Sequence, residues 1–324
     1  MAKYSGRLVN VGVAKEATRG IFVTPTYLVP RVGLTFDDKI VQARSDAGLG
    51  VLADSEEAFV TTKYAQGDID GEIRDKSFGL FLLAMLGSVS TAGPTDSTYT
   101  HSFSVSNANQ HQSLAFLVSD SNTSEEYKLV MLDSLSITAE LDQVVKFAAS
   151  FMSKKGNDSS ETQASLVAEN KFTKKHVAVK VAANIAGLTA ASALSIKSIS
   201  LNINKNVVLD DVLGTAEPED ILNQSLSIEG EMTLNYEDET FKNYMRNGTA
   251  RAMEIKLVNT DVFAAGSTNP ALTLRFPNVD FFDWSPDYTL DGITTQTVSF
   301  KMSYLNTGTE IISTCDLVNA VASY

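Results

Sequence analysis

The chain has 324 residues, of which 44% are hydrophobic and 20% are charged, an ordinary composition for a soluble globular protein. Its formal net charge of −13 disfavours binding to nucleic acid or to an anionic membrane, because phosphate groups are bound by clusters of basic side chains. The lone cysteine, Cys315, excludes an intrachain disulfide and is expected to be a small buried apolar residue. The longest apolar run, residues 79–86, is far too short to span a bilayer, and the N-terminus lacks the apolar core of a signal peptide.

The first half of the chain predicts strands around one helix. Residues 34–50 alternate and run into an Asp-containing, Gly-ended loop, and residues 67–73 follow as a strand. A helix is then expected, capped by Asp75 or Ser77 and ended by Gly87. The half closes with alternating stretches that are typical of half-buried antiparallel strands, at residues 113–118, 127–141 and 144–152.

The second half repeats this order of elements. Residues 199–214 alternate and end in a similar loop, and residues 226–232 parallel residues 67–73, with a glycine inside each strand. A helix at residues 239–246 is expected to be capped by Asp238 and to stop at Asn247 and Gly248. Alternating strands follow at residues 252–258, 272–276, 279–284 and 295–304.

This internal repeat predicts a mainly β protein with two tandem domains, residues 1–165 and 166–324. Each is expected to be an antiparallel β-sandwich or barrel with one short flanking helix. The two halves carry similar net charges, −6 and −7, so neither resembles a separate basic or catalytic module. The polar stretch 153–165 is the predicted join.

The sequence shows no constellation that indicates catalysis. The three histidines, His101, His111 and His176, are not at metal-ligand spacing and are expected to be solvated. The paired aspartates at 37–38 and 210–211 lack the ligand spacing of a calcium loop. Neither a nucleophile elbow nor a phosphate-cradling loop occurs. We therefore predict a protein that is not an enzyme and needs no cofactor or metal.

Trp284 lies in an aromatic cluster, Phe-Phe-Asp-Trp-Ser-Pro, that could stack on a sugar ring. A secreted carbohydrate-binding β-sandwich is therefore one alternative. An anchor in the core or at a subunit interface is the favoured interpretation, since the chain shows neither a signal peptide nor a cluster of exposed aromatic residues.

The order of these segments resembles the tail tube (major tail) protein family of long non-contractile-tailed bacteriophages, with the tube domain duplicated. The resemblance is carried by residues 59–73, the helical stretch 78–87 and the hairpin at 132–137, and in the second half by residues 199–207 with 213–222. These patterns are structural and carry no catalytic signature.

The resemblance implies a structural virion protein whose subunits form rings that stack into a hollow tail tube, through which DNA is delivered to the host. It implies contacts with other copies of the chain, with the tape measure protein and DNA in the lumen without sequence-specific binding, and with tail terminator and tail tip proteins. Two domains per chain favour a homotrimeric, pseudo-sixfold ring, with a homohexamer as the alternative. We expect synthesis in the bacterial host cytoplasm, assembly into the virion tail and no membrane contact. Another tail component is a rival: a tail terminator, a minor tail protein or a contractile-tail inner tube.

Two loops, residues 41–58 and 205–222, resemble those that reach a neighbouring subunit or ring in this family. Each mixes apolar residues with acids, and apolar residues in a long polar loop are best explained by a partner that buries them. The alternative is that the loops fold back on their own domain. The candidate contact residues are Asp46, Leu49, Val51, Leu52, Asp210, Val212, Leu213 and Glu217.

Overall fold

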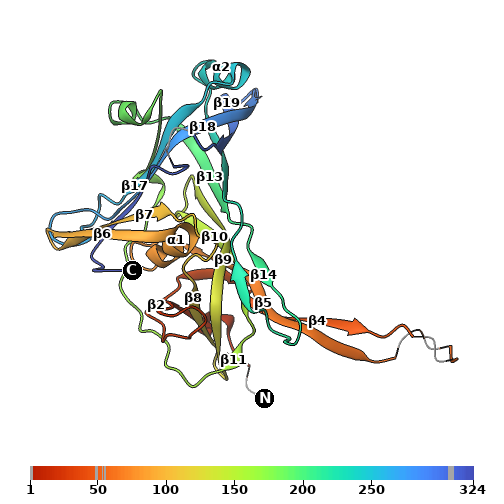
Figure 1. Cartoon of the computed structure of the whole chain (residues 1–324). Helices are drawn as coiled ribbons and strands as arrows, with labels where there is room; N and C mark the ends of the chain where they lie inside the picture. The colour runs from red at the N-terminus through yellow and green to blue at the C-terminus, as the bar shows by residue number, and fades with distance from the viewer. Residues whose placement is uncertain (1–2, 48–49, 53, 55, 306–309) are drawn as a thin grey trace.

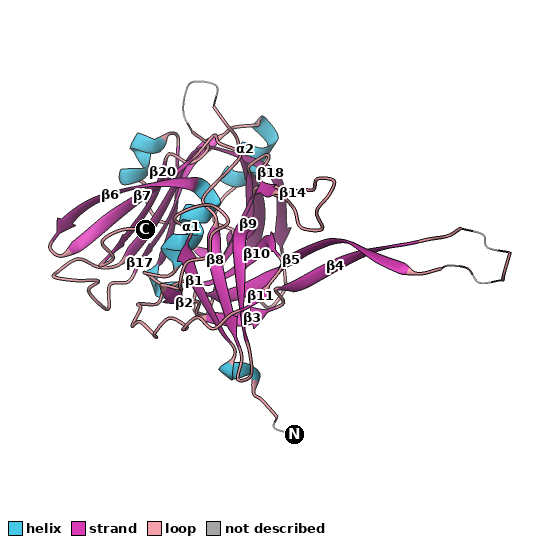
Figure 2. Cartoon of the chain, turned by 60° about the horizontal axis from the view of Figure 1, so that its bottom comes forward, coloured by secondary structure: helices cyan, strands magenta, loops and turns pink. Residues whose placement is uncertain are grey.

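The computed structural model describes residues 3–47, 50–52, 54, 56–305 and 310–324, and consists mainly of antiparallel strands (Figures 1 and 2). The first half holds η1 (Gly6–Leu8), α1 (Phe78–Leu86) and strands β1 (Asn10–Lys15), β2 (Tyr27–Leu28), β3 (Arg31–Leu34), β4 (Asp37–Arg44), β5 (Ala58–Glu72), β6 (Gly87–Thr95), β7 (Thr98–Val105), β8 (Leu114–Ser119), β9 (Ser124–Glu140), β10 (Lys146–Lys154) and β11 (Asn157–Asp158).

The second half holds η2 (Lys174–His176), η3 (Ile185–Thr189), α2 (Thr240–Asn247) and strands β12 (Val177–Ala182), β13 (Ile196–Asn204), β14 (Val208–Asp210), β15 (Asp220–Leu222), β16 (Ser227–Asn235), β17 (Arg251–Val258), β18 (Ala271–Asp287), β19 (Thr295–Met302) and β20 (Thr314–Asn319). The predicted mainly β, antiparallel fold is confirmed. The stretches 272–276 and 279–284, expected as separate strands, form the single strand β18. The β6–β7 hairpin was not predicted.

One long sheet runs through both halves. Its order is β3 and β4, then β5, β10, β9, β13, β16, β19 and β18. A second layer has two parts. One part contains β2, β1, β8 and β11 of the first half, and the other contains β12, β17 and β20 of the second half together with β7 and β6 of the first. The strands β9 and β18 belong to both layers, because the first part of each pairs in the second layer and the last part in the long sheet.

The core of the first half is built around α1. All nine residues of this helix are buried, and the helix is apolar all round, as expected for a helix enclosed by other elements. The rings of Phe78 and Phe81 lie 5.7 and 5.2 Å from that of Phe147 in the long sheet, and Phe81 also packs on Phe151 at 5.6 Å. Burial of one such ring stabilises the fold by roughly 1.5–3 kcal/mol.

The ends of α1 are held by residues distant in the sequence. Ser77 occupies the N-cap position but its side chain does not cap; instead, the Ser77 N–H and hydroxyl donate to Glu169 Oε2 at 2.7 and 2.8 Å. The predicted cap by Asp75 or Ser77 is therefore wrong, and Asp75 accepts from Asn170 N–H at 2.8 Å. The Glu169 carboxylate at the N-terminus of α1 also complements the positive end of the helix dipole.

The buried side chain of Lys205 holds the other end. Its Nζ donates to the carbonyl of Ala84 at 2.8 Å, one of the last helical carbonyls that lack an intrahelical partner. His111 Nδ1 lies 3.1 Å from the Met85 carbonyl, and Gly87 ends the helix with a left-handed φ of 93°. A helix of the first half thus depends on a lysine of the second.

The two halves are joined in both layers. In the long sheet, β9 pairs with β13 from Ser134 opposite Asn204 to Glu140 opposite Ser198. In the second layer β7 pairs with β20. The side chain of Tyr324 packs so closely on α1 that a Cβ added at Gly79 would lie 2.2 Å from its ring. Continuous sheets and shared core contacts therefore cross the predicted division at residue 165.

The second helix follows its sequence signals. The Thr240 N–H donates to Asp238 Oδ1 at 2.8 Å, although the N-cap position is one residue later, at Glu239, and Gly248 ends α2 with a φ of 57°. Phe241 packs on Phe281 of β18 with ring centroids 5.4 Å apart. The predicted helix at residues 239–246 is confirmed within one residue at each end.

Because Lys205 is buried, we predict that the stability of the folded chain depends on pH. Burial lowers the pKa of Lys205 to about 7, although the Asp133 carboxylate opposes the shift. Between about pH 7 and the usual lysine pKa the unfolded chain binds one more proton at this site, so stability rises with pH by up to about 1.4 kcal/mol per unit. Urea unfolding of wild-type protein and Lys205→Met at pH 7, 8 and 9 should show the wild type gaining relative to the variant. Parallel pH dependences would contradict this.

Candidate functional site: an acidic sheet face and a projecting arm

One face of the long sheet is polar and acidic. Along each strand, buried apolar residues that point to the core alternate with half-buried or exposed polar ones, as the period of a strand requires. In β16, Ile228 and Met232 are buried while Glu229 and Glu231 are exposed. The sheet therefore presents a continuous surface of polar side chains opposite the core. We call this surface the acidic face.

Acids outnumber bases on the acidic face. The acidic residues are Asp68, Asp70 and Glu72 of β5, Glu140 of β9, Glu229 and Glu231 of β16, and Asp283 and Asp287 of β18. The lysines on the same side of the sheet are Lys39 of β4, Lys146 and Lys154 of β10, and Lys301 of β19, and Lys301 pairs with Glu229 at 3.8 Å. Serine, threonine and asparagine fill most other positions. This surface is suited to face water and to repel a polyanion.

A two-stranded arm projects from the body of the molecule. It consists of β4 and the first part of β5, and it reaches well beyond the sheets in both views (Figures 1 and 2). All eight residues of β4 are exposed. An isolated hairpin is only marginally stable in water, and exposed apolar groups indicate a surface that a partner covers. The exposed apolar side chains of the arm are Ile40, Val41, Val51, Leu52, Phe59 and Val60.

The predicted loop 41–58 therefore lies on this arm. Asp46, Val51 and Leu52 are exposed at or near its tip, and Leu52 is 107% exposed. Leu49 lies outside the described residues. Nothing in the described part of the chain buries these side chains, so the arrangement agrees with a contact to another molecule.

The predicted loop 205–222 has a different form. It contains the short β14–β15 ladder, and Ala216, which follows its tip, contacts the first half, where the Lys63 N–H donates to the Ala216 carbonyl at 2.6 Å. Glu217 pairs with Lys155 at 3.6 Å, so this residue folds back on its own chain.

The other predicted contact residues of this loop remain accessible. Asp210 is exposed at the end of β14. Val212 and Leu213 are exposed as well, Leu213 at 103%. The loop thus combines one anchored acid with a free apolar tip.

Comparison of the sequence with known protein families shows the family to which this chain belongs. A sequence model of the phage tail tube protein matches residues 6–309, nearly the whole chain. The chain belongs to the phage tail tube protein family. It is a structural protein of the phage tail, a role that fits a protein that is not an enzyme. No curated protein gives a significant match.

The histidines of this tail tube protein are buried, so the expectation that they are solvated is wrong. His101 Nε2 lies 2.9 Å from the Val321 carbonyl, and His111 Nε2 lies 2.9 Å from the Ser106 carbonyl. Burial lowers the pKa of both imidazoles, which favours their neutral form. His176 is also buried and lies 3.2 Å from Asp261. Each histidine bridges segments distant in sequence, which sequence spacing could not reveal.

Cys315 is buried, as predicted, and burial raises the pKa of its thiol. Within the described ranges, no three His, Cys, Asp or Glu side chains are grouped so that they could hold a metal ion. None of the helices in the described chain is both long and apolar enough to cross a membrane.

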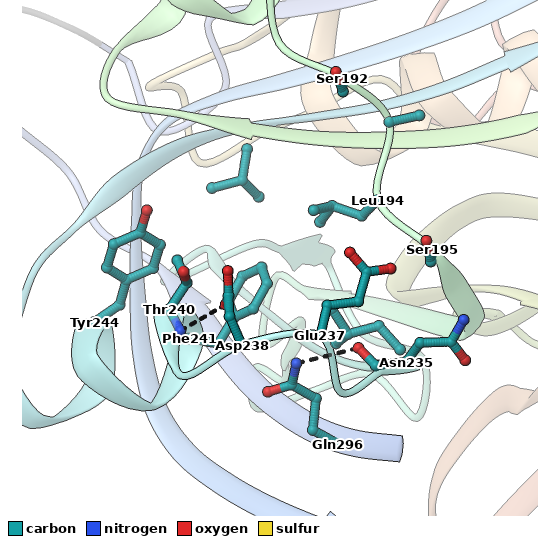
Figure 3. Close-up of a pocket in the computed structure, with 13 residues that line it drawn as sticks. Ser192, Leu194, Ser195, Asn235, Glu237, Asp238, Thr240, Phe241, Tyr244 and Gln296 are labelled. Carbon is teal, nitrogen blue, oxygen red and sulfur yellow. Dashed lines mark hydrogen bonds between the residues drawn. The ribbon is translucent and has the colours of Figure 1, made fainter. Parts of the chain in front are cut away.

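A cleft of about 260 Å³ lies between α2, the segment just before β13 and the end of β16 (Figure 3). Its polar groups have structural partners: Asp238 Oδ1 accepts from the Thr240 N–H at the start of α2, and Gln296 Nε2 donates to the Asn235 carbonyl at 3.3 Å. Beside this cleft, the Trp284 Nε1–H donates to Gln296 Oε1 at 2.7 Å, and Lys242 Nζ lies 5.2 Å from the Trp284 ring. The tryptophan is therefore packed against its own chain, as expected for a structural anchor.

Proposed function

We propose that copies of this chain form rings that stack into the hollow tail tube, and that the acidic face lines the channel through which DNA passes to the host. The proposal rests on the acidic face, because the lining of a DNA channel must be hydrated and must not bind phosphate groups. The tape measure protein and DNA would occupy this channel without sequence-specific contacts. Tail terminator and tail tip proteins would meet the two ends of the tube.

The proposal includes two tandem tube units, residues 1–165 and 166–324. Strand pairing supports it, since β8, β9, β10 and β5 are connected in the same way as β17, β18, β19 and β16. Both hairpins enclose seven residues between their last paired positions, Thr138 with Lys146 and Asp287 with Thr295. Three such chains would complete a pseudo-sixfold ring.

The arm would join neighbouring subunits or rings. Its exposed apolar side chains are best explained by a partner that buries them. A projecting hairpin can also reach a neighbouring molecule that the rest of the subunit does not touch. The apolar tip of loop 205–222, with Val212 and Leu213, would make a second such contact. The exposed acids Asp46 and Asp210 would lie at the rims of these two contacts.

Cryo-electron microscopy of the purified protein tests the proposed assembly. We expect hollow tubes made of stacked rings, with three chains per ring and the acidic face toward the lumen. Six chains per ring would exclude the trimer. Compact monomers under all assembly conditions would exclude ring formation by this chain alone.

Removal of the arm tip should separate folding from tube growth. Replacing residues 46–54 with a two-residue turn leaves the core intact, so the melting temperature should change little while tube yield falls at least tenfold. The full-length variant Val51→Ser/Leu52→Ser should show the same loss if apolar burial is the cause. Normal tube length in both variants would rule out an essential contact at the tip.

Charge reversal on the acidic face should make the channel retain DNA. Tubes of Asp70→Lys/Glu231→Lys should bind a short double-stranded oligonucleotide at about 50 mM salt and release it near 200 mM, since phosphate contacts are strongly salt-dependent. The control Asp158→Lys/Glu310→Lys changes the net charge equally at exposed residues outside this face. Equal retention by both variants would contradict the proposed lining.

A further inference from the structure

We propose that the free edge of β18 pairs with the free edge of β3 and β4 in a second copy of the chain, in the register that β9 uses with β13. The inference rests on the proposed function, because it names the contact that closes the ring. It follows from a contact that one molecule already contains.

The template is the pairing of β9 with β13, which we call the seam between the halves. The last part of β9 pairs with β10 on one side and with β13 on the other. On the core side of this seam, Ile137 stands opposite Leu201 and Leu135 opposite Ile203, all of them buried. On the acidic face, Ser134 stands opposite Asn204.

The last part of β18 matches that part of β9. In β9, Leu132 stands opposite Phe151, one residue bulges, and Ser134 stands opposite Ser150. In β18, Phe281 stands opposite Phe300, one residue bulges, and Asp283 stands opposite Ser299. Asp283 therefore corresponds to Ser134 and Pro286 to Ile137. In the described chain, however, the edge of β18 from Asp283 to Asp287 pairs only with β19.

At the opposite end of the long sheet, β3 and β4 match β13. Gly67 stands opposite Phe151 and Gly230 opposite Phe300, which aligns β5 with β16. Two residues later, Leu34 pairs with Ile69 in the first half, and Ile199 pairs with Met232 in the second. Leu34 therefore corresponds to Ile199, and Lys39 to Asn204. The outer edge of β3 and β4 pairs with no strand of the described chain.

Copying the seam onto these free edges predicts the intermolecular register. Asp283 of one copy lies opposite Lys39 of the next, Pro286 opposite Phe36, and Tyr288 opposite Leu34. Opposite charges thus meet on the acidic face, and directly opposed pairs of this kind stabilise a sheet. Pro286 has no N–H, so one ladder bond is absent, and a proline on an exposed edge limits uncontrolled pairing.

The bulge position supports this register independently. In the template, the bulged Asp133 accepts the Lys205 N–H at its carbonyl at 2.9 Å, and its carboxylate lies near the lysine charge. The corresponding residues at the free edges are Phe282 and Ile40, each 57% exposed. A polar pair inside the chain is thus replaced by two exposed apolar side chains that the proposed seam would bring together and cover.

Disulfide trapping tests the register. Tubes of Lys39→Cys/Asp283→Cys, oxidised with copper phenanthroline, should give chains cross-linked head to tail, because directly opposed residues meet the distance that a disulfide needs. The control Lys39→Cys/Ser285→Cys is two residues out of register and should cross-link at least tenfold less. Native Cys315 is buried and is present in both variants.

The outcomes separate this inference from the proposed function. Tubes seen by microscopy in which the control cross-links as well as the test pair would overturn the register and leave tube formation intact. Cross-linking of Asp283→Cys alone would show β18 pairing with β18 and overturn the inference. In a second test, Lys39→Asp should reduce assembly at least tenfold, and Lys39→Asp/Asp283→Lys should restore it; lack of rescue would count against the opposed pair.

Discussion

The pairing of β9 with β13 is the contact on which the rest of the structure depends. It turns two similar sets of strands into one sheet, so the backbone groups along one edge of each set are satisfied without a partner molecule. It also brings Lys205 beneath α1, where its amine reaches the Ala84 carbonyl. The same seam thus holds the long sheet together and completes the end of a buried helix.

This constraint explains how charge is distributed. A sheet packed on one side by α1 and the second layer has one dry face and one wet face, and the alternation within each strand assigns apolar residues to the first and polar residues to the second. Because the sheet is continuous, the acids of both halves share one surface. Part of the chain's net charge of −13 is thereby concentrated on that surface.

The sequence predicted the elements better than their connections. Alternation and helix signals located β10, β19 and α2, because those signals are local. The cap of α1 by Glu169 and the burial of His101, His111 and His176 depend on segments that meet only in the fold. The acidic face was foreshadowed by acids at every second residue, as at Asp68 and Asp70, yet a pattern in one strand cannot show that its neighbours present acids on the same side. Glu217 was predicted to contact another molecule, but it pairs with Lys155 of the other half of its own chain, and this pairing could not be seen in the sequence.

The segment that connects the halves is docked along its length. Asn157 pairs with Glu126, Gln163 Nε2 donates to the Leu117 carbonyl at 3.0 Å, and Glu169 holds Ser77. A tether fixed at three places does not act as a swivel, so the angle between the two halves is an internal property of the monomer. A molecule that adds to a growing assembly through its sheet edges would bring that curvature with it, and the number of copies that close a circle would follow from the geometry of a single chain.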